Sequence, residues 1–524
     1  MRLRINQLAV RLNYGEADVI KAICRQLRCD SDQLSNLEIL RRSLDARKKD
    51  VLPRYILSVE VDHRGKPPMQ KPGRVEKAPR PEPAPTYPAV APSTNPPIVV
   101  GAGPAGLMAA LTLAQAGHKP LLIERGAATP DREGQVAEFW KSGTLDVESN
   151  VLYGEGGAGL FSDGKLTART KDRARVRRFF ETLVACGAST DILIDAMPHI
   201  GTDDLTQIIP AIRQQIRDFG GACAFNTWFE GLIIENGAVR GIKASGQEIR
   251  TDAVFLATGH SARDVYGQIA RDGVPLEAKP FAVGVRLEIP QRLINTAQYG
   301  KWAEHPLLGS ASFRLTRKEE AHARRCYSFC MCPGGEVISC ASSEGLLTSN
   351  GMSLSARAEP FGNAAFLVPV EQADFPTAHV LGGVAFQEAM EEKAFRAGGS
   401  DYGLPAARLV DFLEGNLGDL PGERSCQRAV PAVLQEILPD FVADTLHAAL
   451  PGMMRELNGT PLEEALLYAS ETRSSAPVRI LRGRDGQSEI KGLYPCGEGA
   501  GYAGGIVSSA LDGMKIAEEF ALKG

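Results

Sequence analysis

The sequence predicts an α/β protein in which a parallel-sheet nucleotide-binding domain carries an inserted α+β domain and follows a small N-terminal α/β module. Three observations predict this architecture. Residues 66–97 hold 11 of the 33 prolines, and proline at this density favours an extended linker. A strand–glycine–helix–strand unit begins at residue 98. A glycine-rich segment near residue 497, followed by a final helix, is typical of a chain that returns late to the same sheet.

These features divide the chain into four parts. We place the N-terminal module at residues 1–65, the linker at 66–97, the nucleotide-binding domain at 98–275 and 485–524, and the inserted substrate or cap domain at 276–484.

Composition favours a cytoplasmic protein. The hydrophobic fraction is 44% and the charged fraction is 23%, as in ordinary soluble domains. No apolar run approaches the roughly 18 residues of a membrane span, so we expect no membrane partner. The opening "MRLRINQLAV" lacks the apolar core of a secretory signal. Ten irregularly spaced cysteines indicate reduced thiols and no disulfide framework.

The N-terminal module is expected to be β-α-α-β and ferredoxin-like. A strand-like "LRINQLAV" is followed by helix-like "GEADVIKAICRQL" and "NLEILRRSLDARKK", and then by the alternating strand "RYILSVEV". Residues 1–97 carry 18 Lys+Arg and 11 Asp+Glu, so their net charge is +7, whereas the whole chain has −4. An RNA-binding role therefore stays open. A solvated basic face is favoured, because this charge is a weak version of a nucleic-acid footprint.

A dinucleotide fingerprint opens the second part. The strand "PIVV" runs into Gly101-x-Gly103-x-x-Gly106, with Pro104 and Ala105 between the last two glycines. Gly101 permits a tight turn, Gly103 lets the backbone approach a pyrophosphate, and Gly106 allows close helix–strand packing. The next strand ends in Glu124 and Arg125, where a carboxylate accepts ribose hydroxyls. We therefore predict a Rossmann-type domain.

The order of later segments separates FAD from NAD. A β-meander with a turn at Asn236-Gly237 begins near Phe229 and leads to Ala257-Thr258-Gly259, and "GLYPCGEGAGYAGGI" follows near the C-terminus. This order resembles the two-dinucleotide-binding-fold flavoproteins, which include fumarate reductase-like and glutathione reductase-like proteins.

A closer resemblance covers nearly the whole chain. The stretches "GEGGAGLFSDGKLTAR", "KPFAVGVRLEIPQ", "YSFCMCPGGEV", "NGMSLSAR" and "ETRSSAPVRI" resemble the bacterial family of uncharacterised FAD-dependent dehydrogenases, also described as NAD(FAD)-utilising dehydrogenase-like. The family name implies FAD and a redox role, without a substrate.

The resemblance implies roles for residues along the cofactor. Glu124 would bind the ribose, Phe229 would place backbone at the adenine, and Glu498 would contact the ribityl or pyrophosphate part. The helix after Gly504-Gly505 would point its positive end at the flavin N1–C2=O edge. The remaining candidates for cofactor binding are Arg125, Gly157, Lys165, Ala257, Thr258, Gly259, Gly497 and Ile506. Lys165 is open to a role at flavin N1 or at a phosphate.

Departures from the better-known relatives narrow the chemistry. The region "GEGGAGLFSDGKL" lacks the C-x-x-x-x-C pair of glutathione reductase-like enzymes, so we do not expect disulfide reduction beside the flavin. No second strand–G-x-G-x-x-G–helix unit occurs. NAD(P)H stays open as an electron donor without a domain of its own. Noncovalent FAD is expected, because no His or Cys attachment motif lies near the fingerprint.

Three residues are candidates for catalysis. Arg473 in "ETRSSAPVRI" is open to binding an anionic substrate group or to a structural salt bridge. His260, after the A-T-G turn, is open to hydrogen bonding with flavin or to proton donation. Cys330 lies in "YSFCMCPGGEVISC", for which three interpretations stay open: a packed or cavity-lining strand, a catalytic or redox-sensing thiol, and a metal site. We favour the first and expect no metal.

The spacing of Cys330 and Cys332 carries a further expectation. In a regular strand the two side chains share a face, with Cβ atoms about 6.6 Å apart. A relaxed disulfide needs about 3.5–4.5 Å, so the pair is expected not to close.

We thus expect an FAD-dependent oxidoreductase that transfers hydride or electrons between flavin and a small molecule. The alternative is a flavoprotein that binds a macromolecule such as RNA through its basic N-terminal module.

Overall fold

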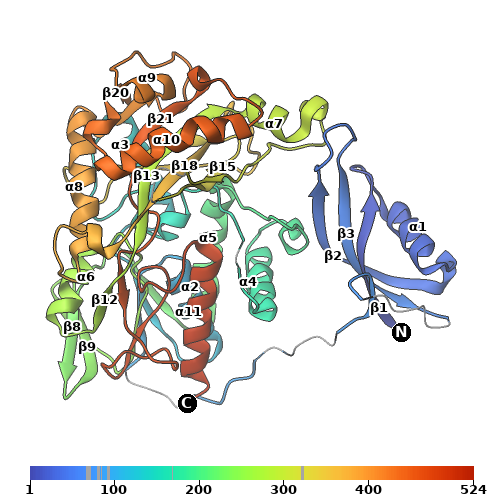
Figure 1. The fold of residues 1–524 in the computed structure, drawn as a ribbon. Helices are drawn as coiled ribbons and strands as arrows, with labels where there is room; N and C mark the ends of the chain where they lie inside the picture. Colours follow the sequence, from blue (N-terminus) through green and yellow to red (C-terminus); the bar gives the residue numbers. More distant parts are fainter. Residues whose placement is uncertain are drawn as a thin grey trace.

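The computed structural model describes residues 1–65, 72–79, 83, 85–90, 95–167, 169–319 and 324–523. Figure 1 shows a small N-terminal module, in blue, beside a larger body. Much of the predicted linker (66–71, 80–82, 84 and 91–94) lies outside the described residues. Within the described part, no helix is long and apolar enough to cross a membrane.

The N-terminal module is a four-stranded antiparallel sheet with one helix. Its elements are β1 (Arg2–Val10), α1 (Glu16–Leu27), β2 (Leu34–Asp45), β3 (Arg54–His63) and β4 (Val75–Lys77). The strand order is β2-β3-β1-β4. The apolar faces of α1 and the sheet enclose a small separate core that includes Ile5, Ile23 and Val59.

The expected β-α-α-β order is wrong in its second helix. The stretch "NLEILRRSLDARKK" forms most of β2, which pairs with β3 along its length through two register shifts. Leu34, Leu37 and Ile39 pack against the module core, and the bulges let the chain keep them there. Tertiary pairing thus overrides local helix propensity. The linker also begins later than expected, because β4 pairs with β1.

The nucleotide-binding domain is built on a five-stranded parallel sheet of order β23-β11-β5-β6-β7. Its strands are β5 (Ile98–Val100), β6 (Leu121–Ile123), β7 (Ala222–Ala224), β11 (Val254–Leu256) and β23 (Leu493–Pro495). The helices are α2 (Pro104–Gln115), α3 (Thr129–Ser142), α4 (Arg173–Ala185), α5 (Thr202–Asp218), α6 (Arg263–Arg271) and α11 (Ile506–Ala521).

The expected meander is present as β8 (Phe229–Glu235), β9 (Ala238–Ala244) and β10 (Gln247–Arg250). Asn236 and Gly237, at its first turn, have φ of 50° and 72°, the positive values that a type I′ hairpin turn requires. This domain forms the lower part of the body in Figure 1.

The inserted domain forms the upper part of the body around a seven-stranded sheet of order β14-β15-β18-β13-β21-β19-β20. The strands are β13 (Phe281–Pro290), β14 (Thr316–Arg317), β15 (Cys326–Cys332), β18 (Phe361–Val370), β19 (Leu404–Arg408), β20 (Ala429–Pro431) and β21 (Leu466–Glu471). Its helices are α7 (Gln291–Tyr299), α8 (Gly382–Ala397), α9 (Leu409–Glu414) and α10 (Asp440–Glu456).

Two small sheets complete the body. The strands β16 (Glu336–Cys340) and β17 (Thr348–Met352) pair with each other, and β12 (Leu276–Ala278) pairs with β22 (Val478–Ile480). The second pair lies where the chain enters and leaves the inserted domain.

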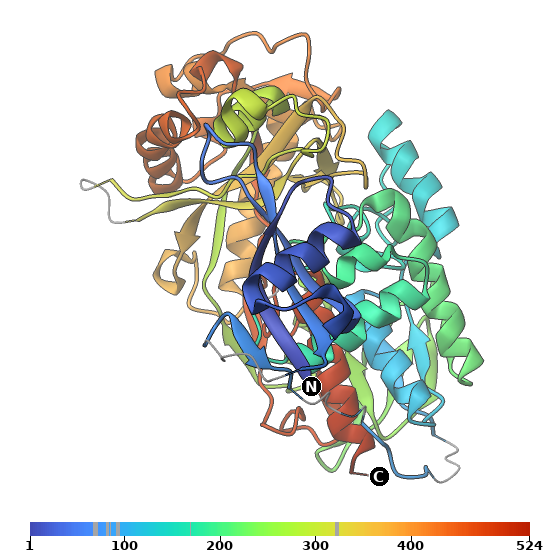
Figure 2. The ribbon, with the colours of Figure 1, turned by 90° about the vertical axis from the view of Figure 1, so that its right-hand side faces the viewer.

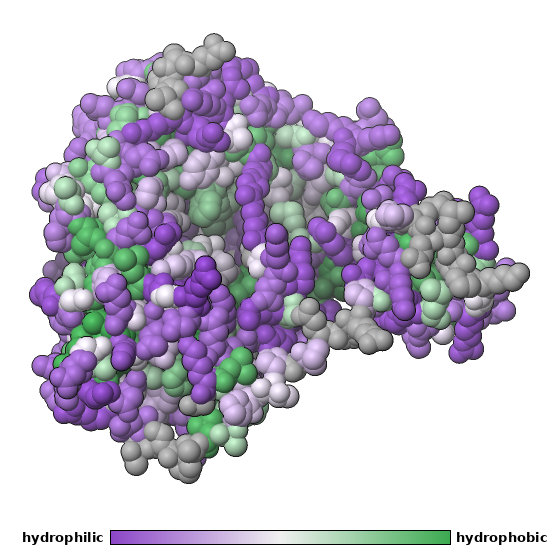
Figure 3. Space-filling view, turned by 60° about the horizontal axis from the view of Figure 1, so that its bottom comes forward, coloured by the Kyte–Doolittle hydropathy of each residue, from purple (hydrophilic) through white to green (hydrophobic). Residues whose placement is uncertain are grey.

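The N-terminal module docks on the body through one edge of its sheet. Figure 2 looks onto the module in front of the body. The Arg42 N–H donates to the Ile194 carbonyl at 2.6 Å, and the Ala196 N–H donates to the Arg42 carbonyl at 2.9 Å. The Arg42 side chain also pairs with Asp195 at 2.7 Å. Figure 3 shows a largely hydrophilic face with a recess between module and body.

Candidate functional site

One open cavity brings together most of the candidate residues. Its volume is about 280 Å³, and it lies where the loops after β5, β6 and β11 face β15, β17 and β21 of the inserted domain. The cofactor candidates that line it are Gly101, Gly103, Pro104, Ala105, Glu124, Arg125, Gly157, Lys165, Phe229, Ala257, Thr258, Gly259, Glu498, Gly505 and Ile506. The three catalytic candidates Arg473, Cys330 and His260 line it as well.

The fingerprint glycines have distinct surroundings. Gly101 has φ +102°, and a Cβ on it would lie 2.5 Å from the Ala257 carbonyl oxygen. A Cβ on Gly106 would lie 1.8 Å from the Gly101 oxygen, so Gly106 serves packing and does not line the cavity. Gly103 caps α2. A Cβ on Gly103 would lie 3.8 Å from the nearest protein atom, the Gly157 Cα. The helix N-terminus therefore has an open approach for an anion.

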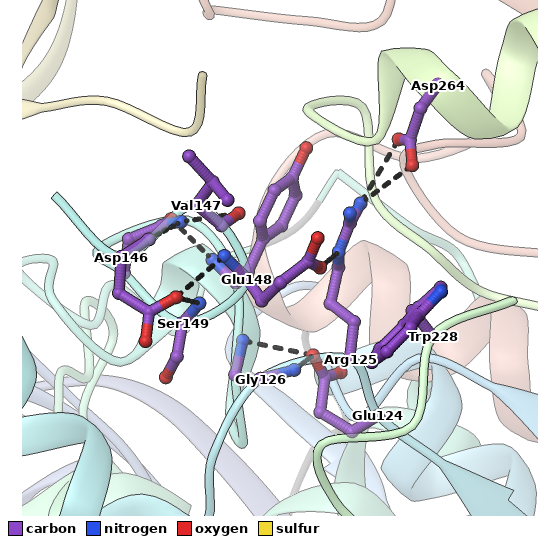
Figure 4. Close-up of polar contacts among 12 residues, drawn as sticks. Glu124, Arg125, Gly126, Asp146, Val147, Glu148, Ser149, Trp228 and Asp264 are labelled. Atoms are coloured by element: carbon purple, nitrogen blue, oxygen red, sulfur yellow. Dashed lines mark hydrogen bonds and ion pairs between the residues drawn. The ribbon is translucent and has the colours of Figure 1, made fainter. Parts of the chain in front are cut away.

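The Glu124 carboxylate is buried and anchors three loops. It accepts hydrogen bonds from the backbone N–H groups of Ala102 at 2.7 Å, Gly126 at 3.0 Å and Gly154 at 3.0 Å. Figure 4 shows the Gly126 contact. A carboxylate has about four acceptor positions, so one remains for a ribose hydroxyl. Glu124 thus shapes the cavity in addition to its expected contact.

Arg125 forms the wall beside Glu124. Its guanidinium lies 4.4 Å from the centre of the Tyr153 ring and pairs with Glu148 at 2.7 Å and Asp264 at 3.1 Å. Figure 4 shows it extended between the two carboxylates, with Trp228 alongside. Its charge is therefore neutralised, and it offers a flat stacking surface more than a free cation.

The glycine loop that includes Gly157 passes beside the N-terminus of α2. Gly157 has φ +60°, and a Cβ on it would lie 3.0 Å from the Gly103 Cα, so this approach favours glycine. At the other end of the loop, Lys165 pairs with Asp163 at 3.1 Å. Arg357 binds the same carboxylate, which leaves one net positive charge at this wall.

The residue that holds this loop, Arg132, is not indicated by the sequence pattern. The fully buried Arg132 donates to the backbone carbonyls of Asn150, Val151, Glu155 and Gly157 at 2.7–2.9 Å. Burial lowers the pKa of its guanidinium to about 10. An arginine within a helical pattern gives no sequence signal for this role, because all its acceptors lie in a distant loop.

The N-terminus of α11 forms the opposite end of the cavity. Gly505 caps the helix with φ +102°, and its N–H donates to Glu498 at 3.3 Å. Burial raises the pKa of Glu498 to about 7. Gly497 and Gly504 do not line the cavity. A Cβ on Gly497 would meet the Ala105 Cβ at 2.6 Å, which ties its role to packing against α2.

His260 lies 3.9 Å from Glu498, between the imidazole Nε2 and the carboxylate Oε1. Burial, together with Arg473 and Arg263, lowers the pKa of its imidazole to about 3. The ring is therefore neutral near pH 7. Of the two roles left open, this favours hydrogen bonding over proton donation by an imidazolium.

Arg473 belongs to a buried charged cluster. Its guanidinium donates to Glu391 at 2.9 and 3.1 Å and to the Ser342 hydroxyl at 2.7 Å. Arg263 binds the same carboxylate at 2.7 and 2.8 Å. Although burial opposes ionisation, the two arginines lower the pKa of Glu391. The cluster keeps one net positive charge, and Arg473 keeps N–H groups for a ligand. Both interpretations of Arg473 are thus compatible.

The expectation of a regular strand at Cys330 is wrong. The three steps from Phe329 to Cys332 lie opposite only two steps from Ala365 to Asn363, and Cys330 has φ +43°. The bulge breaks the alternation on which the 6.6 Å spacing rested. The Cys332 thiol donates to the Cys330 backbone carbonyl at 3.4 Å. The neighbouring Cys332 side chain lowers the pKa of the Cys330 thiol, and the pKa of Cys332 is raised in turn.

The other sulfur candidates are packing residues. Cys326, Cys340 and Cys496 are fully buried, and burial raises the pKa of each thiol. Of these three, only Cys340 lines the cavity. Among the described residues, no group of three His, Cys, Asp or Glu side chains is arranged to hold a metal ion.

Three segments of the chain match known protein families. Residues 280–474 match the family described as FAD-dependent protein, C-terminal domain-like. Residues 95–151 match the FAD binding domain, and residues 2–61 match a domain of unknown function. An uncharacterised protein of Clostridium beijerinckii is 40% identical over 537 residues, which cover all of this chain and 99% of that protein.

Solved structures match the chain with low identity and low TM-scores. The E. coli quinol fumarate reductase FrdA is 14% identical with a TM-score of 0.38, covering 82% of this chain and 69% of its own. The tetracycline destructase Tet(51) is 12% identical with a TM-score of 0.34, covering 82% and 80%. Both scores are low.

The residues of the cavity fit FAD. A phosphate has an open helix N-terminus at Gly103, and the close approach of Gly157 leaves a cradle that any Cβ would fill. The Glu124 carboxylate keeps an acceptor position, and Lys165 and the cap of α11 supply positive potential at the far end. Together with the family matches, these residues identify FAD as the cofactor.

Proposed function

The chain belongs to the same protein family as the uncharacterised Clostridium beijerinckii protein, and from that premise we propose that it is an FAD-dependent dehydrogenase acting on a small molecule. FAD-dependent oxidoreductase chemistry is the broader class that the FAD-binding segments support. The finer assignment to the uncharacterised FAD-dependent dehydrogenases is part of the proposal.

One observation supports the proposed dehydrogenase function most directly. The cavity is shared between the cofactor residues of the nucleotide-binding domain and three reactive side chains, Arg473, His260 and Cys330, contributed near or by the inserted domain. Such a junction of two domains is a usual place for a substrate.

The chain's own residues would hold the cofactor in an extended arrangement. The N-terminus of α2 would bind the pyrophosphate, and Glu124 would bind the ribose. The N-terminus of α11 would stabilise negative charge at the flavin edge. FAD, when bound, supplies hydride or single-electron transfer.

The charges beside Arg473 favour an anionic group on the substrate, although the cavity as a whole is lined by acidic residues as well as basic ones. The Arg473–Glu391–Arg263 cluster has a net positive charge, and Lys279 adds a further cation near His260. The unused N–H groups of Arg473 would bind a carboxylate or similar group. The neutral His260 would add a hydrogen bond without competing charge.

The test begins with the cofactor. Acid or heat precipitation of the purified protein should release yellow FAD into the supernatant; colour retained in the pellet would contradict noncovalent binding. The oxidised holoenzyme is then mixed anaerobically with a panel of small anionic metabolites, and absorbance near about 450 nm, where oxidised flavin absorbs, is followed. Bleaching by one compound supports the proposal. The same bleaching in Arg473→Gln with an unchanged apparent Kd would exclude the anion-binding role.

A further inference from the structure

The bulge in β15 places Cys330 at the wall of the cavity and the neighbouring Cys332 in the core next to it. Cys330 lines the cavity and is partly exposed, whereas Cys332 lies fully buried behind it. The Cys332 thiol lies 3.4 Å from the Cys330 carbonyl oxygen. The Cys330 sulfur, called the front sulfur below, is thus accessible from the cavity, whereas the Cys332 sulfur is protected.

The bulge is held by a buried arginine. Arg286, which is 0% exposed, donates to the Cys330 carbonyl at 3.3 Å and to Asn363 Oδ1 at 2.9 Å. Its remaining N–H groups bind Glu471 at 2.8 and 2.9 Å and Asn350 at 3.2 Å. A left-handed backbone at a non-glycine residue is unfavourable, so it persists here because these bonds fix it.

The charges around Cys330 favour its thiolate. The neighbouring Cys332 side chain, Lys165 and Arg286 favour the Cys330 thiolate, whereas burial and the negative charge of Asp163 oppose it. Glu498 also faces Cys330. The result is a lowered pKa for Cys330, the property of an attacking thiol. Cys326 and Cys340, elsewhere in β15 and β16, show the opposite shift.

The front sulfur also faces the flavin side of the cavity. The same cavity wall includes Glu498, Gly505 and Ile506 at the N-terminus of α11, where the flavin edge is assigned above. Cys330 is therefore next to both the cofactor and the open mouth, where the neighbouring Phe329 is 42% exposed.

Building on the proposed function, we propose that Cys330 and Cys332 are a redox-active dithiol–disulfide couple that passes two electrons from FAD to a small disulfide substrate. The small anionic substrate of the proposed dehydrogenase is the donor that would supply hydride to FAD.

The electrons and protons of this step balance. The Cys330–Cys332 bond breaks as it takes two electrons and one proton from reduced FAD, leaving Cys330 as thiolate and Cys332 as thiol. Cys330 then attacks a substrate disulfide, forms a mixed disulfide and releases one substrate thiolate. Cys332 loses its proton and attacks Cys330, which re-forms the protein disulfide and releases the second thiolate. One proton from solvent, with that of Cys332, completes two substrate thiols.

An anaerobic dithionite titration of the oxidised holoenzyme tests the couple without a substrate. FAD and a disulfide each accept two electrons, so the wild type should consume about twice the reductant per FAD that Cys330→Ser consumes. Cys326→Ser, a buried thiol of the same strand outside the cavity, should match the wild type.

A thiol count on the denatured wild type gives an independent reading that does not depend on a folded variant. The oxidised form should show two fewer thiols than the 10 cysteines of the chain, and fragmentation should locate the bond at Cys330–Cys332. Uptake of two electrons per FAD with all 10 thiols present would overturn the couple while the proposed function stands. Failure of the protein to bind FAD, or of FAD to be reduced, would instead overturn the proposed function.

Discussion

At the scale of single residues, the Glu124 carboxylate has two roles: it holds three loops together and it is expected to bind the ribose. Three backbone N–H groups from separate loops converge on it, so its removal alters the cavity as well as the ribose contact. In Glu124→Gln the amide NH₂ would face at least one of these N–H groups, and an unsatisfied buried donor costs about 1–3 kcal/mol.

We therefore expect Glu124→Gln to bind FAD about 10–100-fold more weakly, because a charge-assisted hydrogen bond is worth about 1.5–3 kcal/mol. Its apo form should also unfold at lower urea. Fluorescence titration with FAD measures the affinity, and Glu148→Gln, which loses only a half-exposed ion pair with Arg125, is the matched control. Wild-type affinity in Glu124→Gln would show that the ribose lies elsewhere.

His260 makes stability depend on pH in a defined direction. Its folded pKa of about 3 lies below the ordinary value of 6.5. As pH falls below 6.5 the unfolded chain takes up the proton first, so the contribution of His260 is constant above this value and is lost progressively towards pH 3. From pH 7 to pH 5 the loss due to His260 should be about 2 kcal/mol, and the raised pKa of Glu498 acts in the opposite direction.

Replacing His260 by Gln should remove that loss. Urea unfolding of each holoenzyme at pH 7 and pH 5, with FAD in excess, measures it, and His379→Gln, at an exposed histidine, should keep the wild-type loss. An equal loss in His260→Gln and the wild type would mean that the imidazole is not held neutral.

At the scale of elements, two glycines of the fingerprint have different roles: Gly103 serves FAD binding, and Gly106 serves the packing of α2. Gly103→Ala adds a Cβ whose nearest protein neighbour is 3.8 Å away, so the fold should persist while the pyrophosphate loses its approach. In Gly106→Ala the new Cβ would lie 1.8 Å from the Gly101 carbonyl oxygen. Helix α2 must therefore move away from β5, which should lower the free energy of unfolding by about 3 kcal/mol.

Circular dichroism, thermal unfolding and FAD occupancy of the two variants measure this difference. Gly103→Ala should melt near the wild type with little FAD, and Gly106→Ala should lose stability even as the apo form. If Gly103→Ala retained full FAD, the pyrophosphate could not lie over the N-terminus of α2.

These elements also show what sequence can predict. The turn at Gly101, the helix after Gly103 and the hairpin at Asn236-Gly237 follow from local backbone requirements, so the sequence indicates them directly. Strand β2 and the bulge at Cys330 do not, because pairing with β3 decides the first and Arg286 helps to fix the second from a strand 44 positions away. Arg132 was missed for the same reason.

At the scale of the whole molecule, four arginines of the N-terminal module form ion pairs within it. Arg2 and Arg4 pair with Glu60, Arg11 pairs with Asp18, and Arg47 pairs with Asp45. These arginines are less free to contact phosphates, and the net charge of +7 over residues 1–97 is a weak footprint for RNA binding. The RNA-binding alternative requires salt-dependent retention on RNA that deletion of residues 1–94 abolishes. We expect wild type and deletion to elute alike.

The docking of this module depends on Arg42, which joins β2 to the segment 190–196 of the body. Its backbone exchanges two hydrogen bonds with that segment, and its side chain pairs with Asp195 and Asp191. A partly exposed ion pair contributes about 0.2–1 kcal/mol, so Arg42→Ala should weaken docking without unfolding either part. Hydrogen exchange at the amides of residues 42 and 196 should therefore accelerate up to about fivefold, since protection reports local opening.

Arg11→Ala is the matched control, because its partner Asp18 lies inside the module and its loss leaves the docking edge intact. Exchange at residues 42 and 196 should then stay at the wild-type rate, while FAD affinity stays unchanged in both variants. Unchanged exchange in Arg42→Ala would place the docking energy in apolar contacts such as that of Ala46, which packs with the core of the body. Accelerated exchange throughout the module would instead mean that Arg42 stabilises the fold of β2 itself.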